Sequence, residues 1–218
     1  MSGTPSEKPR GIPSEKPRAM AGGELLYDLP ANLQPLDAVR GSMLFFHWTW
    51  LRANKRYDDY AARIEAAHRD AILGVTTSDW VPLDVALAHY RALDGAGLSR
   101  QDAFDAGCVV GKLGHGTLLA TILRLAGGLG VSPWQALARA HKMWERQYRG
   151  GGIAVHRVTD RSARVESVRN LAAVSPFHRA AVTGSFSIGI ASLCKVSRIE
   201  EVERARTKDS FTFTIDWA

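Results

Sequence analysis

The residues that could do chemistry in this chain of 218 residues are seven histidines and two cysteines, and their spacing completes no catalytic or metal site. Cys108 and Cys194 stand alone in apolar segments, so we expect buried, reduced thiols. Glu65 and His68 have the three-residue spacing found in di-iron helical bundles. Such sites require a second Glu-x-x-His pair on a facing helix, and the sequence has none. We therefore predict no metal site and no catalytic residue.

Three glycines form the most unusual pattern in the helical half of the chain. Gly107, Gly111 and Gly114 are four and three residues apart, so they would form one smooth stripe on a helix. The Gly-Lys pair that begins at Gly111 is not a phosphate-binding loop, because Leu113 follows it where Ser or Thr is needed. Each glycine inside a helix costs about 1 kcal/mol relative to alanine. Two interpretations stay open: close packing against a neighbouring backbone, or a surface for a ligand.

The ligand interpretation defines a candidate binding set of Gly111, Gly114, His115, His141 and Trp144. His115 lies beside the glycine stripe, and His141 shares a predicted helix face with Trp144. Taken individually, each histidine is better explained by a hydrogen-bonded role in the core or on the surface. A single axial histidine can hold haem, and no spacing rule forbids it. We predict no cofactor, and haem stays open.

The formal net charge of +6 does not indicate a nucleic-acid partner, because the arginines of the body are scattered among acidic residues. The hexapeptide PSEKPR occurs twice, at residues 5–10 and 13–18, and cannot form an apolar face. We predict a disordered tail over residues 1–24 and a single domain over 25–218. The N-terminus lacks the apolar core of a signal peptide, and charges interrupt the longest apolar stretch, residues 103–131. We expect a cytoplasmic protein without a membrane span.

The elements that must position these residues follow a clear order, with long amphipathic segments first and short alternating segments afterwards. The patterns predict helices over about 37–53, 57–73, 80–93, 99–125, 133–149 and 177–193, and strands over 153–158, 163–168, 197–205 and 210–217. Residues 197–205 are also compatible with a helix. This order predicts an α+β fold in which an N-terminal layer of about five helices packs on a four-stranded antiparallel sheet. The helix at 177–193 would be inserted between the two strand pairs.

Helix boundaries and one apolar helix give further expectations. Ser99 and Asp102 have the spacing of a capping box, and Ser132 and Ser175 each precede a proline, as N-cap residues do. The first helix is apolar nearly all round, so it should be buried on more than one side. Its Trp48 and Trp50 are two residues apart and cannot share a face. One of them should therefore contact a second layer, a cavity or a partner.

The chain resembles a family of uncharacterised proteins described mainly from myxobacteria, over about residues 37–217. The resemblance rests on Arg40-Gly-Ser42, Asp79-Trp-Val-Pro-Leu83, the glycine-bearing helix at 107–111, Ser132-Pro-Trp-Gln-Ala-Leu137 with Trp144, the helix at 184–189 and the final Ile-Asp-Trp217. That family is distantly similar to vinyl-reductase-like small-molecule-binding domains, haem-nitric-oxide-binding domains and transport-particle subunits. The resemblance implies an apolar cavity between helices and sheet, and it carries over no catalytic residue. The Tyr-x-Ser-x-Arg signature of the haem branch is absent here.

Together, these patterns and the resemblance lead us to expect a non-enzymatic cytoplasmic domain that binds a hydrophobic small molecule or acts in signalling. The ligand would lie between the glycine-bearing helix, the tryptophan-rich helix and the sheet, in the usual form of an apolar pocket with a few polar groups. The alternative is a structural interaction module with a solid core, which would form a homodimer through the first helix. A third class, an enzyme of unrecognised type, has no support in the sequence.

Overall fold

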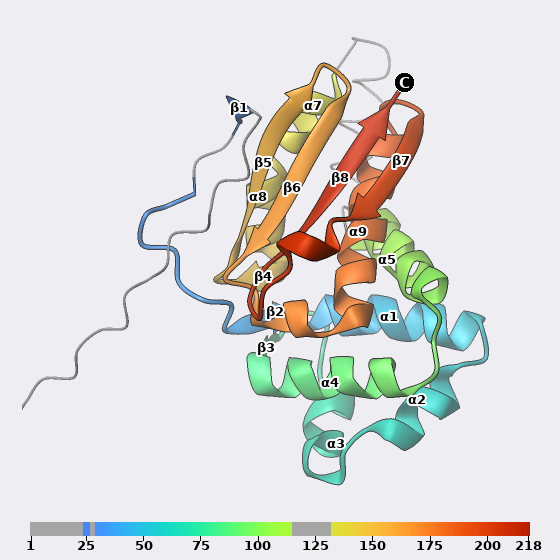
Figure 1. Ribbon diagram of the computed structural model, residues 1–218. Coiled ribbons are helices and arrows are strands. Elements are labelled where there is room, and N and C mark those ends of the chain that lie inside the picture. Colours follow the sequence, from blue (N-terminus) through green and yellow to red (C-terminus); the bar gives the residue numbers. More distant parts are fainter. Residues whose placement is uncertain (1–23, 27–28, 115–131) are drawn as a thin grey trace, which may run out of the picture.

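The computed structural model describes residues 24–26, 29–114 and 132–218, and it has the predicted α+β architecture. An antiparallel sheet carries helices on one face, and a further group of helices lies across one end of the sheet (Figure 1). The predicted tail lies outside the described residues except for Glu24, which begins a short strand.

The main sheet has five strands rather than the predicted four. Its order is β1-β5-β6-β8-β7, and every neighbouring pair is antiparallel. The strands are β1 (Glu24–Leu25), β5 (Gly152–Thr159), β6 (Ser162–Val168), β7 (Val196–Glu201) and β8 (Phe211–Trp217). The additional strand, β1, is only two residues long, so it has no alternating pattern that could be recognised in the sequence. The strand predicted over 197–205 ends at Glu201, and a short 3-10 helix, η2 (Glu203–Ala205), follows it.

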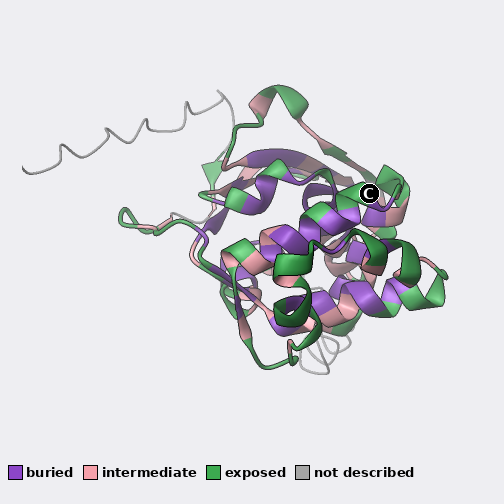
Figure 2. Ribbon diagram, turned by 90° about the horizontal axis from the view of Figure 1, so that it is seen from below, coloured by how far each residue is buried: buried purple, intermediate pink, exposed green. Residues whose placement is uncertain are grey.

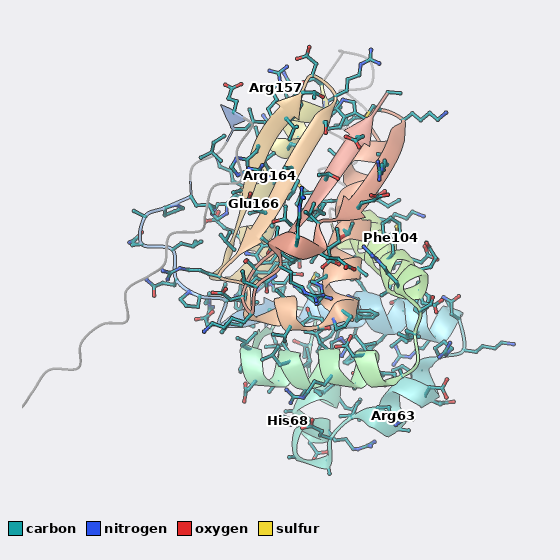
Figure 3. All side chains as sticks on the ribbon, viewed as in Figure 1. Arg63, His68, Phe104, Arg157, Arg164 and Glu166 are labelled. Carbon is teal, nitrogen blue, oxygen red and sulfur yellow. The ribbon has the colours of Figure 1, made fainter. Side chains whose placement is uncertain are left out.

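Apolar and polar residues alternate strictly along β8, so one face of the sheet is apolar and packs against the helices. Phe211, Phe213 and Ile215 are completely buried. The neighbouring strand β6 carries Arg164 and Glu166, which lie side by side on the face turned away from α9 (Figure 3). The Nε atom of Arg164 donates to Oε1 of Glu166 over 2.9 Å. The core therefore lies on the helix side of the sheet.

The helix inserted between the strand pairs is α9 (Pro176–Ala191), as predicted, and a 3-10 turn, η1 (Leu171–Val174), precedes it. The Ser175 hydroxyl accepts a hydrogen bond from the His178 backbone N–H over 3.1 Å, which confirms the predicted cap. Helix α5 (Arg100–Gly114) packs along α9. The predicted continuation of α5 beyond Gly114 lies outside the described residues.

A second, three-stranded sheet was not predicted. Its order is β3-β2-β4, formed by β2 (Ala38–Arg40), β3 (Trp80–Pro82) and β4 (Tyr148–Arg149). Each of these strands lies at one end of a segment that was predicted to be helical. The three observed helices therefore begin later or end earlier than predicted. Two or three residues carry too little periodicity to be recognised, because their strand geometry is fixed by partners distant in sequence.

The helical layer consists of α1 (Gly41–Ala53), α2 (Tyr57–Arg63), α3 (Ala66–Leu73) and α4 (Leu83–Gly95). The prediction of one helix over 57–73 is wrong, because Ile64 is extended, with φ −66° and ψ 122°, and is buried in the core. The predicted helix over 133–149 is also broken, into α7 (Pro133–Leu137) and α8 (Ala140–Gln147). The indole N–H of Trp134 in α7 donates to Asp160 O, whereas that of Trp144 in α8 donates to Gly150 O. The break lets these two tryptophans reach different partners.

The apolar first helix is buried on several sides, as predicted. Trp48 and Trp50 are both buried although they lie on different faces of α1. In Figure 2 the buried stretches of the helices are turned inward and the exposed residues lie on their outer turns. Both tryptophans are therefore covered by the chain itself, although the dimer surface was predicted from the apolar residues of this helix as a whole. The homodimer stays a prediction without this support.

The capping box at the start of α5 gives a first testable prediction. The Ser99 hydroxyl accepts from the Asp102 backbone N–H over 3.1 Å, and the Asp102 carboxylate accepts from the Ser99 backbone N–H over 2.9 Å. We expect Ser99→Ala to lower the free energy of unfolding by about 1 kcal/mol, because the helix loses a cap. Urea denaturation measures this loss, and Ser99→Thr, which keeps the hydroxyl, is the control. Equal destabilisation by both substitutions would contradict the cap.

Candidate functional site

An apolar cavity of about 80 Å³ lies between α9, which covers the sheet, and helices α1, α5, α7 and α8. Met43 and His47 of α1 and Met143 of α8 are among the residues that line it. No lysine, arginine, aspartate or glutamate occurs in the lining contributed by the described residues. The lining is uncharged because each amphipathic helix turns its apolar face toward α9. The volume is about half that of an engineered apolar cavity of about 150 Å³ that binds benzene.

The structure places only part of the predicted binding set at this cavity. Gly114 and Trp144 line it, whereas Gly111 and His141 do not. The Nδ1 atom of His141 accepts from the Ile153 backbone N–H over 3.4 Å, and its Nε2 atom lies 3.4 Å from the Glu145 carboxylate. His115 lies outside the described residues. Binding of a ligand by these residues stays a prediction.

The glycine stripe serves mainly to bring two helix backbones together. A Cβ atom on Gly107 would overlap the backbone carbonyl of Ala181, and one on Gly111 would lie 2.9 Å from the Ser185 carbonyl oxygen. Gly184 on α9 makes the reciprocal approach to the Phe104 carbonyl of α5. Of the two interpretations left open by the sequence, backbone packing therefore describes Gly107 and Gly111. Only Gly114, at the end of the stripe, also faces the cavity.

Two histidines that the sequence did not single out line the cavity. His47 and His178 are each only 1% exposed. Burial lowers the pKa of both to about 3, so both are neutral at pH 7. His178 Nε2 accepts a hydrogen bond from the Asn170 side-chain amide over 3.0 Å. The only signal in the sequence was a histidine inside an otherwise apolar helix, which more often marks a satisfied core residue.

His47 belongs to a buried chain of polar side chains that runs away from the cavity. Its Nδ1 atom lies 3.1 Å from Nε2 of His89, and Nδ1 of His89 lies 2.7 Å from the Tyr60 hydroxyl. The indole N–H of Trp48 donates to the same hydroxyl over 3.2 Å. The pKa of His89 also lies well below its ordinary value, because of burial and the neighbouring His47. All four residues come from the helical layer, on α1, α2 and α4.

One end of this chain is unsatisfied. The Nε2 atom of His47 is buried and has no hydrogen-bond partner among the residues that the structure describes. Gln147, which also lines the cavity, accepts from the Ser42 hydroxyl over 3.2 Å, whereas the buried Tyr90 hydroxyl is a second polar atom without a hydrogen-bond partner among the described residues. An unpaired buried polar group costs about 1–3 kcal/mol, so native structures seldom retain one without a reason.

The other pairs weighed in the sequence have structural partners. Glu65 receives the Arg91 guanidinium over 3.0 Å and lies 3.3 Å from His68 on the exposed side of α3.

No group of three or more potential metal ligands occurs within residues 24–26, 29–114 and 132–218. Cys108 and Cys194 are free thiols of intermediate burial. Over the same ranges, no helix is both long and apolar enough to span a bilayer.

Comparison with known proteins supports the fold and gives no closer assignment. No family model matches the chain, and no curated protein matches its sequence. Two solved structures are similar, both of the Fe(II) unliganded H-NOX protein from K. algicida, one of them a point mutant. Their TM-scores are 0.57 and 0.55, with 13% and 14% sequence identity. Each match covers 82% of this chain and 96% of the H-NOX chain. The chain therefore has an H-NOX-like fold, in agreement with the haem-nitric-oxide branch of the resemblance.

The described cavity does not fit haem. Haem is a planar macrocycle several times larger than benzene, whereas the cavity has only about half the volume of one that holds benzene. Haem also carries two propionates, and the described lining has no cation to pair with them. His141 is turned toward Glu145 and the backbone of Ile153 rather than toward the cavity. The arrangement instead suits a smaller and less polar molecule.

Proposed function

We propose that this protein is a non-enzymatic, cytoplasmic binding domain whose cavity between α1, α5, α7, α8 and α9 holds a small hydrophobic molecule. The observation that carries the proposal is the combination of an apolar, uncharged lining with one buried nitrogen, His47 Nε2, that has no partner among the described residues. Ligand sites commonly have this form, in which apolar walls supply affinity and a few polar groups fix orientation.

Two methionines of the lining support reversible binding of a small molecule. Met43 and Met143 face the cavity from two different helices. Methionine side chains have several rotatable bonds and a polarisable sulfur, so they adapt to ligands of different shape. A ligand that touches both helices and α9 would alter how the helical layer sits on the sheet. This coupling is the basis for a signalling role, which we propose together with binding.

A cavity-filling substitution tests this function. Ala136 lines the cavity from α7 and is only partly buried, so Ala136→Phe can place its ring there without filling a tightly packed position. We expect native mass spectrometry of the wild-type protein, purified from its own host, to show an added mass that is lost on denaturation. Less than about a tenth of the Ala136→Phe protein should carry that mass, because the ring occupies the same space.

The matched control for this experiment is Gln135→Phe, which adds the same ring at the neighbouring, exposed position. It should retain the added mass at the wild-type level. An unliganded wild-type protein that also fails to bind small apolar molecules in solution would refute the proposed function. Equal loss of the mass in both variants would show that the cavity is not the binding site.

A further inference from the structure

The hydrogen bonds of the buried chain determine which nitrogen of His47 carries the proton. The Tyr60 hydroxyl accepts from Trp48 Nε1, which can only donate. If Tyr60 donates its own hydrogen to His89 Nδ1, then each contact along the chain from Trp48 to His47 joins one donor to one acceptor, and only His47 Nε2 is left without a partner among the described residues. The reverse arrangement would place two donors on the Tyr60 oxygen and leave its hydrogen without an acceptor in a completely buried position.

The tautomers of both histidines follow from this choice. With Nδ1 of His89 acting as an acceptor, its neutral ring carries the hydrogen on Nε2, which donates to Nδ1 of His47 over 3.1 Å. His47 is neutral as well, so its own hydrogen must be on Nε2. The unpartnered Nε2 atom of His47, a residue that lines the cavity, is therefore an N–H donor and not a free lone pair.

We propose, on the basis of the function proposed above, that His47 is the specificity-determining residue of the cavity and that the ligand is a small, neutral, apolar molecule with one hydrogen-bond acceptor, such as a ketone, aldehyde or ester carbonyl oxygen. The acceptor receives the hydrogen of His47 Nε2, which has no partner among the described residues. The remainder of the ligand contacts the apolar lining, including Met43 and Val182.

The charge of the lining excludes the obvious alternative ligands. A carboxylate or phosphate would bring a negative charge into a cavity whose described lining contains no cation, and a buried unpaired charge is strongly unfavourable. An ammonium ligand would present only donors to a donor, and its charge would find no carboxylate in the described lining. A pure hydrocarbon would fill the space but would leave His47 Nε2 unsatisfied. A neutral carbonyl compound satisfies both the apolar walls and the N–H group.

The test uses two probes of the same shape, cyclopentanone and methylenecyclopentane, which differ only in the C=O and C=CH2 groups. Affinities for wild type, His47→Phe, His47→Gln and Met43→Leu are measured by NMR titration. In His47→Phe, we expect the ratio of ketone to alkene affinity to fall about tenfold, because the buried carbonyl loses its donor. His47→Gln keeps an amide donor and should retain most of the ratio. Met43→Leu changes the lining on the same helix without a polar atom, so the ratio should stay constant.

A second measurement needs no variant, so it holds even if His47→Phe does not fold. The nitrogen-15 shifts of the wild-type imidazoles report the tautomer. We expect His47 to be protonated at Nε2, and its N–H proton to shift downfield with the ketone but not with the alkene. Protonation at Nδ1 would overturn the inference. If both probes bind but His47→Phe leaves their ratio unchanged, the inference fails and the proposed function stands. If neither probe binds the wild type, both fail.

Discussion

Gly184→Ala is expected to destabilise the protein by about 3 kcal/mol or more, because the added methyl group meets backbone and not a flexible side chain. The Cβ atom would overlap the Phe104 carbonyl group of α5, and the Cys108 backbone nitrogen would lie 3.2 Å away. Phe104 lies on the helix that packs along α9 (Figure 3). Two helix backbones can separate only by moving all their other contacts, so overpacking here costs more than at an adaptable site. Urea denaturation gives the change in the free energy of unfolding.

The matched control lies five residues further along the same helix. Apart from the chain neighbours and the backbone of α9 itself, no atom of the residues that the structure describes lies within 4 Å of a Cβ atom built on Gly189. Gly189→Ala should therefore stabilise the protein by up to about 1 kcal/mol, through the higher helix propensity of alanine. The two substitutions are chemically identical and are expected to act in opposite directions. If Gly184→Ala were neutral, the close approach of α5 and α9 would not exist as described. A Gly184→Ala protein that is insoluble while Gly189→Ala is soluble would agree with the prediction.

The glycine positions show how far the sequence could specify this fold. Their spacing predicted a smooth helical stripe, and the alternation of residues 211–217 predicted the last strand, because both patterns arise within one element. Neither pattern names the partner element. That α5 lies on α9, with Gly107 against Ala181, follows from three-dimensional packing between segments more than 70 residues apart. The choice between packing and ligand binding could therefore be made only with the structure.

The family resemblance predicted an apolar cavity, but the histidines that line it were not predicted. The sequence pointed to histidines near the glycine stripe or near Trp144, since proximity along a helix was the only available criterion. His47 and His89 are 42 residues apart and come together only because α1 and α4 pack in one layer. Their polarity inside apolar helices gave a weak signal, because a buried histidine usually has its hydrogen bonds satisfied. The unpaired Nε2 atom, which makes His47 distinctive, is a property of the folded state alone.

The burial of His47 and His178 predicts that the free energy of unfolding falls strongly as the pH is lowered. His47 and His178 have a pKa of about 3 when folded, because burial disfavours the charged ring, against about 6.5 when unfolded. Between these values the unfolded chain binds more protons than the folded one, so stability falls as the pH is lowered. From pH 7 to pH 5 each histidine removes about 2 kcal/mol, and the two together about 4 kcal/mol. Since domains are stable by about 5–15 kcal/mol, this is a large fraction of the total.

Neighbouring groups modify this loss without reversing it. The pKa of His89 is also well below its ordinary value, which adds to the effect, and the positive charge of Arg179 further disfavours protonation of His178. Asp94 acts in the opposite direction, because burial raises its pKa and protonation then favours the folded state. The pKa of an unfolded aspartate is about 3.9, so this contribution is confined to the lower end of the pH range.

Urea denaturation at pH 7, 6 and 5, followed by tryptophan fluorescence, measures the acid sensitivity. In His47→Gln, one titrating group is removed and an amide donor is kept, so the pH-dependent loss from pH 7 to pH 5 should be about 2 kcal/mol smaller than in the wild type. A wild-type stability that is constant from pH 7 to pH 5 would show that these rings are hydrated or already charged in the folded protein. His47 would then no longer be a fixed neutral donor, and the neutral carbonyl ligand inferred for the cavity would lose its physical basis.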